Sequence, residues 1–101
     1  MESPPPHLRI DKFLWFTRLA GSRSAAQALV EAGHVRLNGR RIERAHTPVR
    51  AGDLITYTHG NGARVVRAAG LPLRRGPFTE AQGFYENISV GGWKILLTPP
   101  Y

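Results

Sequence analysis

The chain has 101 residues, of which 42% are hydrophobic and 21% are charged, so one globular domain is expected. The absence of cysteine excludes disulfides and cysteine-ligated metal sites, and no apolar run approaches the ~20 residues needed to span a bilayer. The net charge of +7, with twelve Arg among 14 basic residues, favours a nucleic-acid partner because Arg pairs with phosphate through two N–H groups.

Residues 1–7 include three consecutive prolines and are predicted to be a disordered lead-in. The first helix is predicted to begin after Asp11, a favourable N-cap residue, and to run to about Ala20. Gly21 is expected to end this helix, because glycine readily adopts the left-handed conformation that closes many helices.

The second helix is predicted over residues 22–32, with Ser22 as its cap and Gly33 as its end. Small alanines gather on one side of it at helical spacing, so it is expected to pack closely on the first helix. The opposite side carries three polar residues, Arg23, Gln27 and Glu31. Because a carboxylate repels phosphate, an anion contact on this side is expected to fade towards Glu31.

A hairpin is predicted around Asn38-Gly39, a dipeptide typical of the type I′ turn, with strands at 34–37 and 40–42. This register places Arg36 opposite Arg41 on one face of the sheet. Two cations in that position destabilise a sheet unless an anion lies near them, and such a local conflict is typical of a binding site.

The pattern further along predicts a loop over 43–48, strands over 54–59 and 63–69, and a short helix over 77–86. The pattern from residue 89 onward predicts no particular structure. The expected fold class is therefore α+β, with two N-terminal helices packed on a short antiparallel sheet. The domain is expected to span residues 8–69, and residues 70–101 are expected to form a C-terminal extension.

Several motifs occur in a fixed order: RIDKFLW from residue 9, SRS from 22, GHV from 33, LNG from 37 and GD from 52. With this spacing, the stretch from about residue 8 to 57 resembles the S4 RNA-binding domain, which is named after a small-subunit ribosomal protein. The later motifs LRRGP, EA and YE resemble the segment that follows this domain in the bacterial heat shock protein 15 family. The resemblance implies a small S4-like (alpha-L) domain that binds ribosomal RNA and the large ribosomal subunit. It also implies a role in rescuing stalled subunits that still carry a nascent chain on tRNA.

An exposed helix N-terminus favours phosphate, because free backbone N–H groups and the helix dipole both attract anions. The start of the second helix and the hairpin are therefore predicted to line one basic groove that recognises a folded RNA by its shape. The residues predicted to contact RNA are Arg9, Lys12, Arg18, Ser22, Arg23, Ser24, Gln27, Arg36, Asn38, Arg40 and Arg41. The first three are included because they resemble further contacts of the S4 family. Purely structural roles, as a helix cap for Ser22 and a turn residue for Asn38, remain open alternatives.

The leading interpretation is a non-catalytic, ribosome-associated RNA-binding protein, with a stress-response role implied by the resemblance. The sequence has no carboxylate pair, nucleophile–base pair or phosphate loop, so no enzyme activity, cofactor or small-molecule substrate is expected. The four histidines lack metal-ligand spacing, so no metal site is expected. Two alternatives are an RNA-targeting accessory subunit of an RNA-modifying enzyme and a general basic protein that binds DNA. A cytoplasmic monomer without membrane contact is expected.

Overall fold

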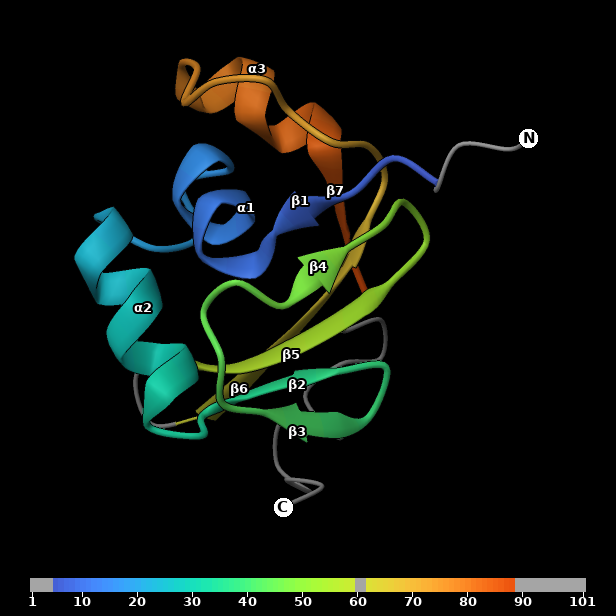
Figure 1. Cartoon of the computed structure of the whole chain (residues 1–101). Helices are drawn as coiled ribbons and strands as arrows, with labels where there is room; N and C mark the ends of the chain where they lie inside the picture. Colours follow the sequence, from blue (N-terminus) through green and yellow to red (C-terminus); the bar gives the residue numbers. More distant parts are fainter. Residues whose placement is uncertain (1–4, 60–61, 89–101) are drawn as a thin grey trace.

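The computed structural model describes residues 5–59 and 62–88 (Figure 1). Its main feature is an antiparallel sheet with the strand order β3-β2-β5-β6-β7. These strands are β2 (Val35–Leu37), β3 (Arg40–Ile42), β5 (Leu54–His59), β6 (Gly62–Ala68) and β7 (Tyr85–Asn87). A separate pair of short antiparallel strands joins β1 (Leu8–Arg9) to β4 (Pro48–Val49).

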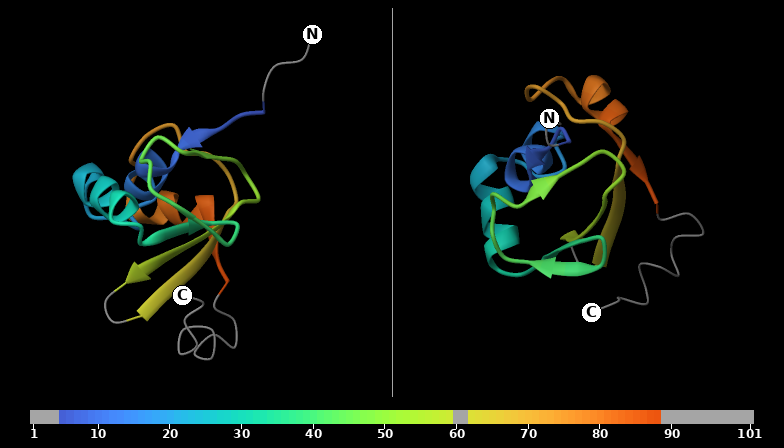
Figure 2. Two further views of the ribbon diagram at one scale, coloured as in Figure 1. Left: turned by 60° about the horizontal axis from the view of Figure 1, so that its bottom comes forward. Right: turned by 45° about the vertical axis from the view of Figure 1, so that its right-hand side comes forward.

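The helices α1 (Ile10–Phe16) and α2 (Arg23–Glu31) cover one face of the sheet, and both views in Figure 2 agree on this arrangement. On its other flank, α1 faces the short helix α3 (Phe78–Ala81) and the 3₁₀ turn η1 (Gln82–Phe84) (Figure 1). The predicted α+β class, with two N-terminal helices packed on an antiparallel sheet, is confirmed.

The first helix begins earlier than the sequence predicts, at Ile10. No side chain caps it, because the N–H of Ile10 donates to the carbonyl of Thr47 and the N–H of Asp11 donates to the carbonyl of Ala45. The prediction that Asp11 caps this helix is therefore wrong. Asp11 instead lies in its first turn and is completely buried.

The first helix also ends earlier than predicted, because Arg18 adopts a left-handed φ of 63°. The N–H of Ala20 then donates to the carbonyl of Leu14 at 2.9 Å, which closes the helix end. The prediction that the helix runs to Ala20 and is ended by Gly21 is wrong for this reason. The Nε of Arg18 donates to the carbonyl of Gly76 at 2.6 Å, and this contact helps to hold the uncommon backbone conformation.

The second helix agrees with its prediction. The Oγ of Ser22 accepts a backbone N–H from the first turn at 3.0 Å, so the capping role of Ser22 is confirmed. Ala26 and Val30 are fully buried on the side that faces α1 and the sheet. Gly33 follows the last turn with a φ of 78°, a conformation that strains any residue with a Cβ atom.

The first hairpin has the predicted register, with Arg36 opposite Arg41. Asn38 and Gly39 have φ angles of 53° and 84°, as the type I′ turn requires. The amide of Asn38 donates to the Oδ1 of Asp53 at 3.1 Å, and its oxygen accepts the first N–H of β5 at 2.8 Å. These bonds tie the turn to the neighbouring strand and confirm the structural role of Asn38.

The second hairpin is also confirmed, with β5 and β6 paired antiparallel, while residues 60–61 of its turn lie outside the described residues. The helix predicted over 77–86 is shorter, because the chain forms α3 and η1 and then extends as β7 along β6. Within the described part of the predicted extension, β7 is thus the edge strand of the main sheet. Residues 1–4 and 89–101, from the predicted lead-in and extension, lie outside the described residues.

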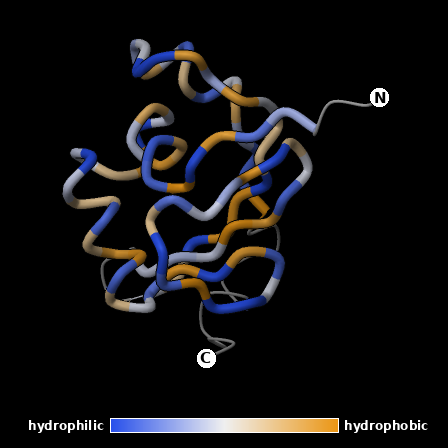
Figure 3. Tube along the Cα trace, viewed as in Figure 1, coloured by the Kyte–Doolittle hydropathy of each residue, from blue (hydrophilic) through white to orange (hydrophobic). Residues whose placement is uncertain are grey.

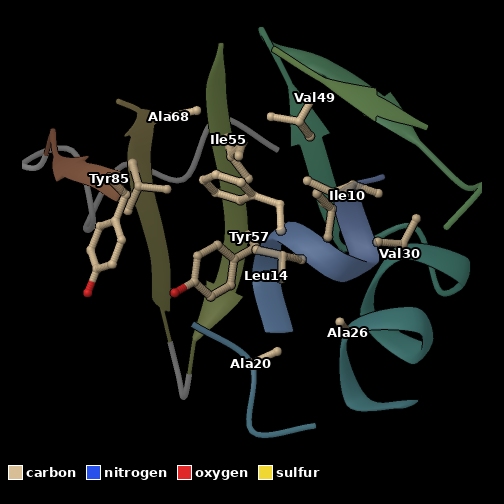
Figure 4. Close-up of a cluster of buried hydrophobic side chains, with 13 residues drawn as sticks. Ile10, Leu14, Ala20, Ala26, Val30, Val49, Ile55, Tyr57, Ala68 and Tyr85 are labelled. Carbon is tan, nitrogen blue, oxygen red and sulfur yellow. The ribbon is translucent and has the colours of Figure 1, made fainter. Parts of the chain in front are cut away.

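The hydrophobic core lies between the helices and the sheet (Figure 4). Ile10 and Leu14 of α1 are fully buried in the same cluster as Ile55 and Tyr57 of β5, and Leu14 lies beside Tyr57 (Figure 4). Burying an aliphatic side chain of this size stabilises the fold by about 1.5–3 kcal/mol. Figure 3 shows apolar segments along the central strands and a hydrophilic tip on the β2–β3 hairpin. Among the described helices, none has the length and apolar character that a membrane span needs.

Candidate nucleic-acid interface

A buried carboxylate connects the first two helices. Asp11 is 0% exposed and accepts hydrogen bonds from three side chains. Arg9 donates to both carboxylate oxygens, from Nε at 3.0 Å and from Nη2 at 2.9 Å. From α2, Arg23 donates through Nε at 3.3 Å and Gln27 through Nε2 at 3.1 Å, both to Oδ2. We call these four residues the Asp11 cluster.

The surroundings of Asp11 determine its charge. Burial raises the pKa of this carboxyl, because the ionised form loses its hydration. The hydrogen bonds from Arg9, Gln27 and the N–H of Lys12, together with the charge of Arg9, outweigh burial and hold the pKa of Asp11 below its ordinary value. The carboxylate is therefore ionised at neutral pH and neutralises one of the two guanidinium charges beside it.

Both guanidinium groups of the Asp11 cluster retain N–H groups for a ligand. The side chains of Arg9 and Arg23 are 41% and 37% exposed, whereas Asp11 lies completely beneath them. Arg9 uses two of its five N–H groups on Asp11 and Arg23 uses one; the others make no hydrogen bond within the described residues. Two neighbouring guanidinium groups with free N–H edges match the oxygens of a phosphate.

The other predicted residues nearby come from the same two helix starts. Lys12 follows Asp11 in the first turn of α1, and Ser22 and Ser24 are exposed at the start of α2. The hydroxyl oxygens of these two serines lie 3.3 Å apart. The structure thus gathers six predicted residues at the starts of α1 and α2, and we call them the helix surface: Arg9, Lys12, Ser22, Arg23, Ser24 and Gln27.

The hairpin arginines form a second group. Since Val35 points into the core, its neighbour Arg36 and the opposed Arg41 point to the other face of the sheet. There, a pocket of about 120 Å³ is lined by Gly33, His34, Arg36, Arg41 and Thr58. The guanidinium of Arg41 lies so close to Gly33 that a Cβ atom there would come within 2.3 Å of it. Arg41 also pairs with Glu43 at 3.2 Å, in an exposed contact worth little stability.

The structure therefore divides the predicted basic residues rather than joining them in one groove. The helix surface lies at the start of α2, and the Arg36–Arg41 pair lies beyond its end, about 13 Å along a helix of nine residues. Arg40 is exposed beside the hairpin turn, where it lines a shallow hollow with Leu37, Asn38, Ile42 and Thr47. Arg36 and Arg41 also use the sheet face that the helices leave uncovered, which the linear pattern does not indicate.

Two arginines connect the segment before α3 to the end of α1 through hydrogen bonds to backbone carbonyls. Arg18 donates to the carbonyl of Gly76, and Arg75 donates to the carbonyl of Trp15 at 2.5 Å. The guanidinium of Arg75 also lies over the Trp15 ring, 6.0 Å from its centroid. Arg18 therefore has a structural contact beside its predicted RNA contact, and Arg75 has a role that the sequence pattern does not reveal.

The role of Asp11 is also hidden in the sequence. Its side-chain partners come from two places in the chain, since Arg9 precedes it by two residues and the other two lie on α2. Only the packing of α1 on α2 brings Arg23 and Gln27 to it. The one available signal is the four-residue spacing of Arg23 and Gln27, which places both on the same side of α2.

Comparison with known proteins places the fold in a family. The S4 domain matches residues 8–55, which contain both helices and the first hairpin. The solved trimeric structure of heat shock protein 15 from Vibrio cholerae aligns with a TM-score of 0.78 and 30% identity, covering 84% of this chain and 85% of that one. The chain belongs to the S4-domain family of heat shock protein 15. It thus carries an RNA-binding domain of the S4 type.

Curated relatives agree with this assignment. Heat shock protein 15 of Escherichia coli (strain K12) is 33% identical over 88 residues, which is 87% of this chain. The chain spans 65% of the length of that relative. The small ribosomal subunit protein uS4 of Acidithiobacillus ferrooxidans is 30% identical over 91 residues, covering 90% of this chain and 41% of that protein.

Proposed function

We propose that this protein binds structured RNA without catalysing a reaction, and that its helix surface holds the phosphate backbone. The observation that carries the proposal is the pair of guanidinium groups from Arg9 and Arg23, fixed on one buried carboxylate with free N–H groups exposed. Charge-assisted bonds of this kind supply affinity and position the protein on RNA, while the shape of the RNA supplies specificity.

We further propose that the target is ribosomal RNA, on the large subunit, and that binding serves the rescue of stalled subunits that carry a nascent chain on tRNA. Membership of the heat shock protein 15 family and the relationship to ribosomal protein uS4 support a ribosomal target. The RNA-binding unit is proposed to span residues 8–69. The hairpin residues Arg36, Asn38, Arg40 and Arg41 form a second proposed contact, and Arg18 a third.

Two alternative functions differ from our proposal in the partner that the protein is expected to bind. A general basic protein would bind duplex DNA as tightly as RNA, because its affinity would come only from phosphate neutralisation. An accessory subunit of an RNA-modifying enzyme would copurify with that enzyme from cell extract. Crosslinking the protein in extract and sequencing the attached RNA separates both from our proposal, which expects recovery of large-subunit RNA near the tRNA sites.

The direct test measures the affinity for a labelled large-subunit RNA fragment by fluorescence anisotropy over a series of salt concentrations. Neutralising about four to six phosphates gives a slope of log affinity against log salt of roughly −3 to −5. Arg9→Ala and Arg23→Ala are each expected to weaken binding about tenfold, or ~1.4 kcal/mol. Arg67→Ala, which removes the same charge from an exposed position on β6, is the matched control. Equal loss in all three variants, or equal affinity for duplex DNA, would contradict the proposal.

The assembly state is a separate question. The monomer expected from the sequence stays a prediction, and the solved structure of the Vibrio cholerae relative is trimeric. Light scattering after size exclusion gives the mass directly, and a mass three times that of the 11.2 kDa chain would contradict the monomer.

A further inference from the structure

We infer that Asp11 is a positioning residue for RNA binding, and that its carboxylate holds the guanidinium groups of Arg9 and Arg23 in the arrangement that receives phosphate. The inference rests on the proposed function of the helix surface. It assigns a role in RNA affinity to an acidic residue that RNA cannot touch, since its side chain is 0% exposed.

The first argument is geometric. The Nη2 of Arg9 and the Nε of Arg23 both lie within 3.3 Å of the same oxygen, Oδ2 of Asp11. Two guanidinium groups so close together repel each other unless a negative charge lies between them. Asp11 supplies that charge from the buried side, so the free N–H edges of both groups remain available on the solvent side.

The second argument concerns conformational entropy. An arginine side chain has many rotamers in solution, and immobilising each one on binding weakens the association measurably. Arg9 is held through two hydrogen bonds and Arg23 through one before any ligand arrives. Gln27 donates to the same oxygen as Arg23 and completes the arrangement from α2. Ordering the ligand-binding groups in the free protein is therefore expected to raise affinity.

These arguments lead to a test in which two explanations predict opposite signs. Asp11→Asn removes one negative charge, so simple electrostatics predicts tighter RNA binding. Positioning predicts weaker binding for two reasons. The new amide NH₂ is a donor that cannot accept the N–H groups of Arg9 and Arg23, and the substitution removes the negative charge between the two guanidinium groups. We expect affinity to fall about tenfold, the size expected when one or two side chains must be ordered on binding. Glu31→Gln is the matched control, because it removes the same charge from an exposed position on α2. It is expected to leave affinity unchanged or raise it.

The outcomes separate this inference from the function on which it rests. If Arg9→Ala and Arg23→Ala weaken binding but Asp11→Asn tightens it as Glu31→Gln does, positioning is wrong and the helix surface still binds RNA. If neither arginine variant weakens binding, the proposed function fails and the inference fails with it. If both arginine variants and Asp11→Asn weaken binding while Glu31→Gln does not, the inference is supported.

A measurement on the unmodified protein tests the inference even if the Asp11→Asn variant does not fold. Nitrogen-15 NMR can observe the Nε–H signals of Arg9 and Arg23 directly. We expect both signals to be resolved and slow to exchange in the free protein, and to stay hydrogen-bonded after RNA is added. Signals that average with solvent in the free protein, or that lose their hydrogen bonds on adding RNA, would overturn the positioning role.

Discussion

Replacing Gly33 by alanine tests the placement of Arg41 without removing its charge. Gly33 has a φ of 78°, where an added Cβ atom destabilises the backbone by about 1–2 kcal/mol. The new Cβ would also come within 2.3 Å of the Arg41 guanidinium and displace it. Because the Arg41 side chain is 58% exposed, it can move into solvent at a further cost below about 1 kcal/mol.

The matched control is Gly52→Ala, since Gly52 has a φ of 95° and its Cβ would meet no atom within 4 Å. Thermal unfolding is expected to show a similar loss of stability for both variants, on the order of 4–16 °C in Tm. Only Gly33→Ala is expected to weaken RNA binding, provided Arg41 contacts RNA as proposed. A destabilisation of Gly33→Ala more than about 3 kcal/mol beyond the control would refute the reasoning, because it would mean that Arg41 cannot move aside.

Two further predictions concern stability. Arg75→Ala removes a hydrogen bond to the carbonyl of Trp15 and is expected to lower the free energy of unfolding by about 1 kcal/mol, measured by urea denaturation. Arg74→Ala, which breaks only an exposed pair with Glu80, should change it by less than about 0.5 kcal/mol. The pKa of Asp11 in the folded state lies below the ordinary value of 3.8. Ionised Asp11 therefore contributes fully to the stability of the fold above pH 3.8, and this contribution is lost as the pH falls towards the folded-state pKa. As the pH is lowered from about 5 to 2, the free energy of unfolding should therefore fall more steeply for the wild type than for Asp11→Asn. Parallel curves for the two proteins would contradict this.

Local patterns predicted the parts of the fold whose causes are local. Ser22 and Gly33 bound the second helix because a hydroxyl cap and a left-handed residue act within one turn. The hairpin register follows from Asn38-Gly39 for the same reason. The first helix was predicted less well, because distant carbonyls in the loop before β4 accept its first N–H groups and Arg18 takes the left-handed position that glycine usually fills.

The candidate site shows a similar division. Residue type and clustering were sufficient to select Arg23 and Gln27, and the resemblance to the S4 family selected Arg9. The structure brings the three together. Their common partner could not be predicted, because Asp11 at the start of a helix has a simpler interpretation as a cap. The separation of Arg36 and Arg41 from the helix surface also depends on tertiary structure, since it follows from which sheet face the helices cover.

The two arginine pairs of this protein differ in one respect that bears on function. Arg9 and Arg23 share a buried, ionised carboxylate, so their mutual repulsion is offset whether or not RNA is bound. In the opposed pair of Arg36 and Arg41, the guanidinium of Arg41 contacts the exposed carboxylate of Glu43, and that contact is screened by salt. An arriving phosphate therefore meets donors that are more exposed to solvent and salt at the hairpin, and better-ordered donors at the helix surface. Because salt screens exposed charges more strongly than partly buried ones, the hairpin contact should be the first to weaken as ionic strength rises.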